Sequence, residues 1–170
     1  MLKTITPIDN SVLVERQYAN DKEIENVLQN AKEAQNNWKN TTLNERKQLI
    51  VKFVSSFLSN EEEVVEALCR QIGRPISQCP GEMRGFEERA NYMIENSDRA
   101  LEKVISKSDN EFDNYIRKEP LGTIFVIAPW NYPFNTSVNS IVPSLLAGNT
   151  VILKHSSQTP LCAEQLFDAA

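Results

Sequence analysis

The residues best placed to do chemistry are an asparagine and a lysine that each follow a short apolar run. Asn131 lies in the stretch VIAPWNYPF, where Pro129 and Pro133 bracket it, and Lys154 directly follows the run TVIL. A side-chain amide held by flanking prolines is a rigid neutral donor that can stabilise a developing oxyanion. A lysine at the mouth of a crevice is suited to bind ribose hydroxyls or phosphate. The pair is therefore a candidate ligand site.

Each of these residues also has a simpler interpretation. Asparagine and proline form turns for purely local reasons, and a lysine at the end of a strand is commonly just solvated. Trp130 either forms the wall of a planar ligand site or fills the top of the core. His155, the only histidine, is either a proton carrier or a loop residue near the ligand. The spacing alone leaves these alternatives open.

The elements around the candidate site predict where its residues meet. The apolar runs 123–127 and 150–153 indicate two buried strands, with helical spacing over 138–146 between them and Pro160 opening a final helix. A strand, helix, strand unit forms a parallel pair, and we expect its strands to be apolar on both faces. Ligands bind beyond the carboxyl ends of such strands, so Asn131 and Lys154 should share one edge of the sheet.

The first hundred residues are predicted to be helical. Four amphipathic segments are expected, at 21–38, after Thr42, from Asn60 to Gly73, and over about 81–104. Capping boxes are predicted where Asn20 precedes Glu23, Thr42 precedes Glu45, and Asn60 precedes Glu63. The charge-rich segment 106–110 should end the last helix, and 111–119 resembles an exposed or edge strand. We also expect Pro143 to bend the helix in which it lies or to reset its start.

Composition excludes several classes of function. The 170-residue chain carries 18 basic and 23 acidic residues, so its net charge of -5 does not favour nucleic-acid binding. No apolar run reaches the length that spans a bilayer, and we expect a cytoplasmic protein. The three cysteines lack the spacing of a zinc site or disulfide framework. Cys69 and Cys162 are interpreted as inert buried thiols, whereas Cys79 is expected to be the most exposed, and none has an activating base.

The stretch from Pro120 to Pro160, PLGTIFVIAPWNYPFNTSVNSIVPSLLAGNTVILKHSSQTP, resembles the aldehyde dehydrogenase superfamily. The similar features are Pro-Leu-Gly, Pro-Trp-Asn-Tyr-Pro, a Gly-Asn stop and a lysine-led loop, in that order. The helical first hundred residues agree, including the Gly-Arg-Pro at 73–75 and the Gly-Glu at 81–82. The resemblance covers the whole chain.

This resemblance implies a role for each candidate residue. Asn131 would donate its amide to the oxyanion of a thiohemiacetal, and Ala128, Pro129 and Trp130 would line the nicotinamide ribose site. Lys154 would contact the adenosine ribose of NADP or NAD. The loop that follows, His155, Ser156 and Ser157, would complete the cofactor site.

Two residues depart from the pattern of the family. His155 stands where many members have proline, and Ser157 stands where members that prefer NAD often have a glutamate. A carboxylate would repel a 2'-phosphate, whereas a serine hydroxyl would not, so Ser157 favours NADP.

The resemblance implies an incomplete aldehyde dehydrogenase fold. We expect an α/β architecture with a helical layer followed by the start of a Rossmann-like, doubly wound parallel sheet. Residues 1–110 would form the mainly helical part of the cofactor-binding domain. Residues 111–170 would supply an edge strand and the first strand-helix-strand-helix unit, and the catalytic domain would be absent.

The implied activity is oxidation of an aldehyde to a carboxylic acid with NAD(P)+ through a cysteine thiohemiacetal and thioester. The nucleophile and general base would lie beyond residue 170, so the chain alone should be inactive, and the complete protein should be a homo-oligomer. Two parallel strands do not make a stable sheet, which also suggests a piece of a longer protein or a sheet completed by another chain. The alternative is a truncated, inactive family member that acts as an interaction or regulatory protein.

Overall fold

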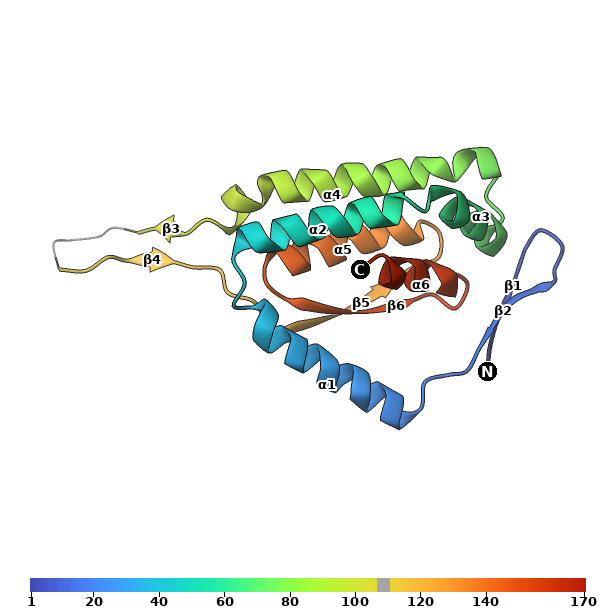
Figure 1. Ribbon diagram of the computed structural model, residues 1–170, viewed down its shortest axis with the longest axis horizontal. Helices are drawn as coiled ribbons and strands as arrows, with labels where there is room; N and C mark the ends of the chain where they lie inside the picture. The colour runs from blue at the N-terminus through green and yellow to red at the C-terminus, as the bar shows by residue number, and fades with distance from the viewer. Residues whose placement is uncertain (107–110) are drawn as a thin grey trace.

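The computed structural model describes residues 1–106 and 111–170, and it shows a mixed helix and strand fold (Figure 1). In chain order the elements are β1 (Leu2–Ile5), β2 (Val12–Arg16), α1 (Asp21–Trp38), α2 (Leu43–Leu58), α3 (Glu61–Ile72), the 3-10 turn η1 (Ile76–Gln78), α4 (Pro80–Leu101), β3 (Val104–Ile105), β4 (Tyr115–Ile116), β5 (Thr123–Ala128), α5 (Pro133–Leu146), β6 (Thr150–His155) and α6 (Pro160–Asp168).

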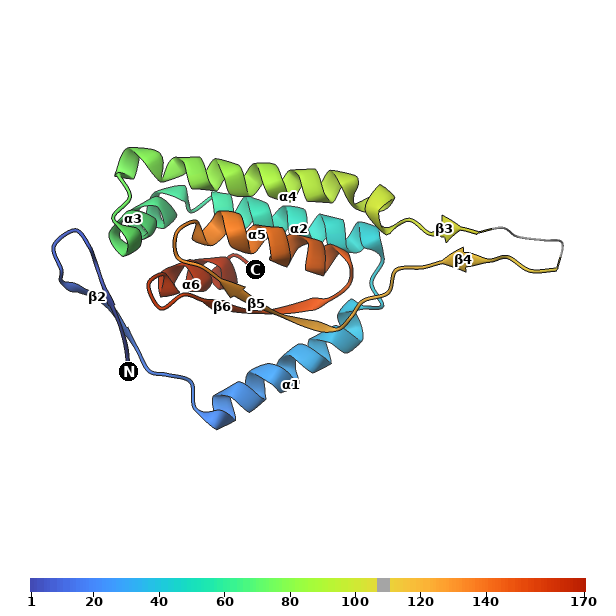
Figure 2. The same cartoon turned by 180° about the vertical axis from the view of Figure 1, so that it is seen from behind.

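The helices form a layer over one side of a two-stranded parallel sheet. Helices α4, α2 and α5 run side by side above β5 and β6, while α1 lies on the opposite side of the strands (Figures 1 and 2). The β1–β2 and β3–β4 hairpins project at opposite ends of the body. The chain therefore has the predicted α/β class, with a parallel sheet beginning at its C-terminal end.

The predicted parallel pair is confirmed. Strand β5 pairs with β6 in a continuous register from Thr123 opposite Thr150 to Ala128 opposite His155. The start of the pair is tied to α1, because Gln35 accepts a hydrogen bond from Thr150 N at 2.7 Å and donates one to Gly148 O at 2.9 Å. This side chain satisfies two backbone hydrogen-bonding groups in the connection between α5 and β6.

Most of the predicted helix ends are confirmed. Asn20 with Glu23 and Thr42 with Glu45 form reciprocal capping boxes, and Gly73 ends α3 in the left-handed conformation with φ 70°. The box at Asn60 was wrong: Asn60 separates α2 from α3 directly, and its side-chain amide donates to Ser56 O of the preceding helix at 3.4 Å.

The other departures in the helices are small. Helix α4 ends at Leu101, short of the predicted 104. Helix α5 runs through Pro143 without a new start, as buried side chains before and after the proline keep it packed. Residues 107–110 of the charge-rich segment lie outside the described residues.

Two strand predictions were wrong in their details. The first hundred residues contain a hairpin, β1–β2, whose short strands, LKTI and VLVER, carry little period-2 signal. The strand predicted near the start of 111–170 exists as β4, but it pairs antiparallel with β3 and forms a separate two-stranded sheet instead of an edge of the β5–β6 sheet. A local antiparallel partner 10 to 12 residues away requires no crossover, which favours this pairing.

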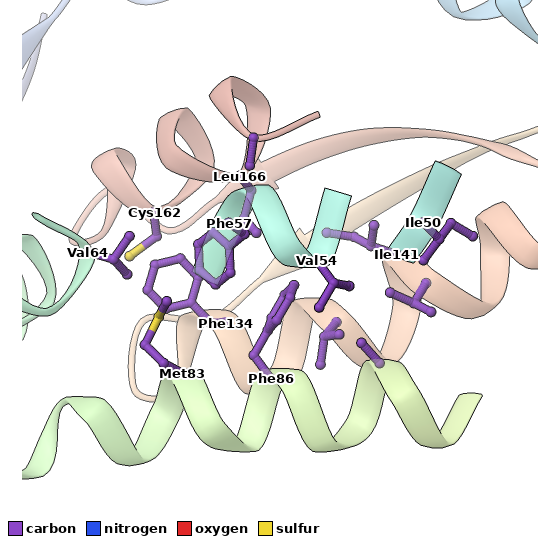
Figure 3. Close-up of a cluster of buried hydrophobic side chains, with 14 of the residues drawn as sticks. Ile50, Val54, Phe57, Val64, Met83, Phe86, Phe134, Ile141, Cys162 and Leu166 are labelled. Carbon is purple, nitrogen blue, oxygen red and sulfur yellow. The ribbon is translucent and has the colours of Figure 1, made fainter. Parts of the chain in front are cut away.

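The core joins the helices of the first hundred residues to the strand-helix unit. Phe57 of α2 packs against Phe86 of α4 and Phe134 of α5, with ring centroids 4.6 and 5.0 Å apart (Figure 3). All three rings are at most 1% exposed. Residues on both sides of position 110 therefore share one hydrophobic core.

The sequence predicted strands that are apolar and buried on both faces. The structure shows that one face of β5 is buried and the other is exposed. Val126 and Ala128 of β5 are buried, whereas Phe125 and Ile127 are 60% and 67% exposed. Helix α1 packs against this face at the start of the pair, where Gln35 binds Thr150 N, and leaves Phe125 and Ile127 exposed. The first turns of α1 expose the apolar side chains of Ile24, Val27 and Leu28 in the same way.

The aromatic core makes a stability prediction. Replacement of Phe86 with alanine should lower the free energy of unfolding by about 3–5 kcal/mol, because it removes a fully buried ring and leaves a cavity. Urea titration monitored by circular dichroism measures this change. Tyr92→Ala on the exposed side of the same helix is the control and should change it by about 0.5 kcal/mol or less. Equal losses in the two variants would contradict the assigned core.

Candidate functional site at the carboxyl edge of the parallel pair

The structure brings the two predicted loops together at one edge of the sheet. Ala128 lies opposite His155 in the register, and Ile127 lies opposite Lys154. Pro129, Trp130 and Asn131 follow the first strand, and Ser156 and Ser157 follow the second. Because both strands end at the same level, every residue proposed from the sequence lies on or beside this edge.

Asn131 lies in a short loop between the end of β5 and the start of α5. Pro133 occupies the first turn of α5, where its missing N–H costs nothing. Asn131 is exposed, and within the described residues its side-chain amide makes no hydrogen bond. The amide is thus free to donate to a ligand, while the backbone of the same residue is held.

Two charged residues that sequence reasoning did not assign to the site hold this backbone and the start of α5 that follows it. Glu82, whose side chain has no exposed surface, forms an ion pair with Arg74 and accepts hydrogen bonds from Phe134 N at 2.8 Å and Asn135 N at 3.3 Å. Arg74 Nη2 donates to Asn131 O at 2.6 Å. The only sequence signal for this pair was the Gly-Arg-Pro and Gly-Glu stretches at 73–75 and 81–82.

The second loop is held by the N-terminal hairpin. Thr4, only 1% exposed, donates through Oγ1 to Ser157 O at 2.8 Å, and Gln158 Nε2 donates to Ile5 O at 3.1 Å. Arg16 forms a two-point ion pair with Glu164 of α6, with both nitrogen-to-oxygen distances at 2.8 Å. The hairpin therefore fixes the loop backbone and leaves Ser157 exposed.

The chemistry of the exposed groups suits an anionic, hydroxyl-bearing ligand. Lys154 offers an exposed ammonium, Ser157 an exposed hydroxyl and Asn131 an exposed amide, all along one edge. A dinucleotide presents ribose hydroxyls and phosphate oxygens, which accept hydrogen bonds from such donors. The donor set present thus fits a nicotinamide dinucleotide.

His155 is buried beneath this edge and not exposed on it. Its side chain is 6% exposed, and neither ring nitrogen has a hydrogen-bond partner among the described residues. Burial, with the charge of Lys154 as a smaller cause, lowers the pKa of His155 to about 4. The imidazole is therefore neutral near neutral pH.

Two of the three cysteines, Cys79 and Cys162, are poor nucleophiles where they lie. Cys162 is fully buried, with Gln71 Nε2 3.5 Å from its sulfur, and burial raises its pKa strongly. Cys79 was expected to be exposed and is fully buried at the start of α4, where desolvation also raises its pKa. The Gly73–Pro80 turn folds its sulfur inward, 3.7 Å from Arg74 O. Cys69 is half-buried on α3.

Across residues 1–106 and 111–170, histidine, cysteine and carboxylate side chains form no cluster of three or more that could hold a metal ion. Within the same ranges, no helix is long and apolar enough to cross a membrane.

Comparison with known proteins decides the family. Residues 1–170 match the aldehyde dehydrogenase family along their whole length. The chain belongs to this family. It is 33% identical over 165 residues to 3,6-anhydro-alpha-L-galactose dehydrogenase of Vibrio sp. (strain EJY3), an alignment that covers 96% of this chain and 34% of that enzyme. The chain thus spans about one third of the length of this relative.

Two solved structures show the same fold. The succinic semialdehyde dehydrogenase from Streptococcus pyogenes, solved with NADP+, superposes with a TM-score of 0.89 at 24% identity, over 99% of this chain and 38% of that one. PnpE, solved with nicotinamide adenine dinucleotide, gives a TM-score of 0.90 at 26% identity, over 98% of this chain and 34% of that one. The described fold corresponds to the N-terminal part of these structures.

The burial of His155 predicts a pH dependence of stability. Its pKa is about 4 when folded and 6.5 ordinarily, so the unfolded chain binds more protons between these values. Stability should therefore fall as pH drops through this window, and this one group should account for about 2 kcal/mol between pH 7 and pH 5. Urea titrations at both pH values on the unmodified chain and on His155→Gln measure it. The variant should lose that part of the slope, and an identical slope in both proteins would contradict the prediction.

Proposed function

We propose that this chain is the cofactor-binding N-terminal part of an enzyme that oxidises an aldehyde to a carboxylic acid with NAD(P)+. The observation that carries the proposal is the convergence of the Asn131 loop and the Lys154 loop at the carboxyl edge of the β5–β6 pair. Membership of the aldehyde dehydrogenase family supports it. When bound, the cofactor supplies the acceptor for the hydride.

The Asn131 amide is the proposed catalytic group of this chain. Attack of a thiolate on an aldehyde converts its carbonyl oxygen into an oxyanion, and a fixed N–H donor stabilises that charge. A neutral amide serves here because it donates without losing a proton. The nucleophilic cysteine and the general base are proposed to come from sequence outside residues 1–170, because Cys79 and Cys162 are buried and their pKa values are raised.

The cofactor is proposed to lie along the edge with its adenosine half near Lys154 and Ser157 and its nicotinamide half near Ala128, Pro129 and Trp130. Lys154 and Ser157 donate to the ribose, and Ser156 belongs to the same loop. The buried imidazole of His155 supports the loop from below and makes its contribution by packing. The nature of the aldehyde is left to residues outside this chain.

A non-catalytic role is a second candidate, favoured by one observation. Leu121, Phe125 and Ile127 expose an apolar surface along β5, at 89%, 60% and 67%. Such a face, with an unpaired strand edge beside it, can pair with another chain. A chain with this role would bind a full-length family member without contributing to turnover.

The deciding experiment joins residues 1–170 to the two thirds of the Vibrio relative that follow the aligned region. The fusion should reduce NADP or NAD when given an aldehyde, as followed by absorbance, and the unfused chain should not. Asn131→Ala in the fusion should lower kcat about 100- to 1,000-fold, the loss expected for one oxyanion donor. Turnover by the unfused chain that survived replacement of all three cysteines would overturn the proposed mechanism.

Cofactor preference gives a second prediction. Ser157→Glu in the active fusion should lower kcat/KM for NADP relative to NAD by about tenfold or more, because a carboxylate repels the 2'-phosphate and accepts from the ribose diol. Ser157→Ala is the matched control: it removes the hydroxyl without adding charge, so it should affect NADP modestly and NAD little. An unchanged ratio in Ser157→Glu would remove the argument for Ser157.

A further inference from the structure

We propose that Arg74 and Glu82 are positioning residues for the oxyanion donor, because together they fix the backbone of Asn131 and thereby aim its side-chain amide. The inference rests on the proposed function of Asn131. It assigns a catalytic consequence to a buried ion pair that lies outside the cofactor loops. Neither residue reaches the reacting atoms, so each acts through Asn131.

Glu82 lies in an environment that compensates a buried charge. Its carboxylate has no exposed surface, and a buried charge is costly unless hydrogen bonds and an opposite charge compensate it. Oε1 accepts from Phe134 N and Asn135 N at the start of α5, where the helix dipole also favours a negative charge. Oε2 accepts from Arg74 Nη1. Glu82 thus locks the N-terminus of α5 to α4.

The guanidinium group of Arg74 binds two acceptors at once. One guanidinium nitrogen binds Glu82 while the other donates to Asn131 O at 2.6 Å. The same group lies 4.5 Å from the ring centroid of Tyr132, the residue next to Asn131. The side chain is 14% exposed: its contact with the fully buried Glu82 is shielded from solvent, whereas its bond to Asn131 O lies at the surface. A planar fork can bridge two acceptors in this way, whereas an ammonium on a lysine stem cannot reproduce the geometry.

The backbone on both sides of Arg74 is conformationally restricted. Arg74 lies between Gly73, whose φ is 70°, and Pro75. A side chain at Gly73 would lie 2.8 Å from Pro7 Cγ, so the turn is also packed against the N-terminal segment. The backbone that carries Arg74 is therefore restrained, and the hydrogen bond from its guanidinium to Asn131 O in turn restrains the Asn131 peptide.

The consequence for catalysis follows from the tolerance of an oxyanion donor. Such a donor must be held to within about 0.5 Å of its productive position, and a misplacement of about 1 Å can reduce the rate about 100-fold. Within the described residues no hydrogen bond fixes the Asn131 amide itself, so its direction depends on the backbone to which it is attached. Arg74 is the side chain that binds that backbone.

The first test measures mobility in the 170-residue chain, where no activity is needed. Nitrogen-15 relaxation should give backbone order parameters at Asn131 and Tyr132 near 0.85 in the unmodified chain and below about 0.6 in Arg74→Lys. Glu82→Gln keeps an acceptor for α5 but removes the ion pair, and it should loosen the same two residues. Arg70→Lys is the matched control, because Arg70 is exposed on α3 and, among the described residues, forms its ion pair with Glu66, at 3.8 Å. Unchanged order parameters in both test variants would overturn the proposal.

The second test is a double-mutant cycle in the active fusion. Arg74→Lys should lower kcat about tenfold or more, leave the KM for the cofactor within about twofold, and cost nothing further when Asn131 is already alanine. A merely structural role would reduce kcat by the same factor in both backgrounds, and that result would overturn the positioning role. If Asn131→Ala leaves kcat unchanged, the proposed oxyanion function fails, while the relaxation data still decide whether Arg74 holds the loop.

Discussion

The structure depends on the compensation of one carboxylate that has no contact with solvent. The carboxylate of Glu82 must accept hydrogen bonds to remain charged in the interior. Its donors are Arg74, in the turn after α3, and the first peptides of α5. Meeting that need joins Arg74, only 8 residues before Glu82, to the start of α5, which lies 52 residues after it. The cost of an uncompensated buried charge, several kcal/mol, makes alternative arrangements of these segments unfavourable. The short loop that carries Asn131 is held by Arg74 at Asn131 O and ends at the first peptides of α5, which Glu82 binds.

The aromatic core explains why the assembly is possible. Phe57, Phe86 and Phe134 come from three helices and stack within about 5 Å of one another in consecutive pairs, which fixes α2, α4 and α5 as one layer. Phe134 lies directly after Pro133, so the side chain that anchors the core and the peptide that binds Glu82 belong to the same residue. Packing and polar compensation therefore position the same turn from two sides.

How much of this could be predicted from sequence depended on whether the signal was local. The capping boxes at Asn20 and Thr42, the left-handed Gly73 and the parallel β5–β6 pair were all predicted, because each depends on residues close together or on strong apolar runs. The β1–β2 hairpin was missed because its strands are short and lack a clear period-2 alternation. The burial of Cys79 and the roles of Arg74 and Glu82 depend on contacts with segments that are distant in the sequence, and the Gly-Arg-Pro and Gly-Glu stretches do not reveal those contacts.

The distribution of chemistry along the chain has a physical logic. The groups at the sheet edge are donors and one cation, which bind and orient, whereas the thiols at positions 79 and 162 are buried where the thiolate is disfavoured. A chain of this kind can hold a cofactor and an oxyanion donor still, but it offers no accessible nucleophile among those two thiols. The exposed apolar face of β5 lies beside the same edge. Ile127 of that face pairs with Lys154 in the register, so the uncovered apolar surface reaches the end of the strand pair at which the donor groups lie.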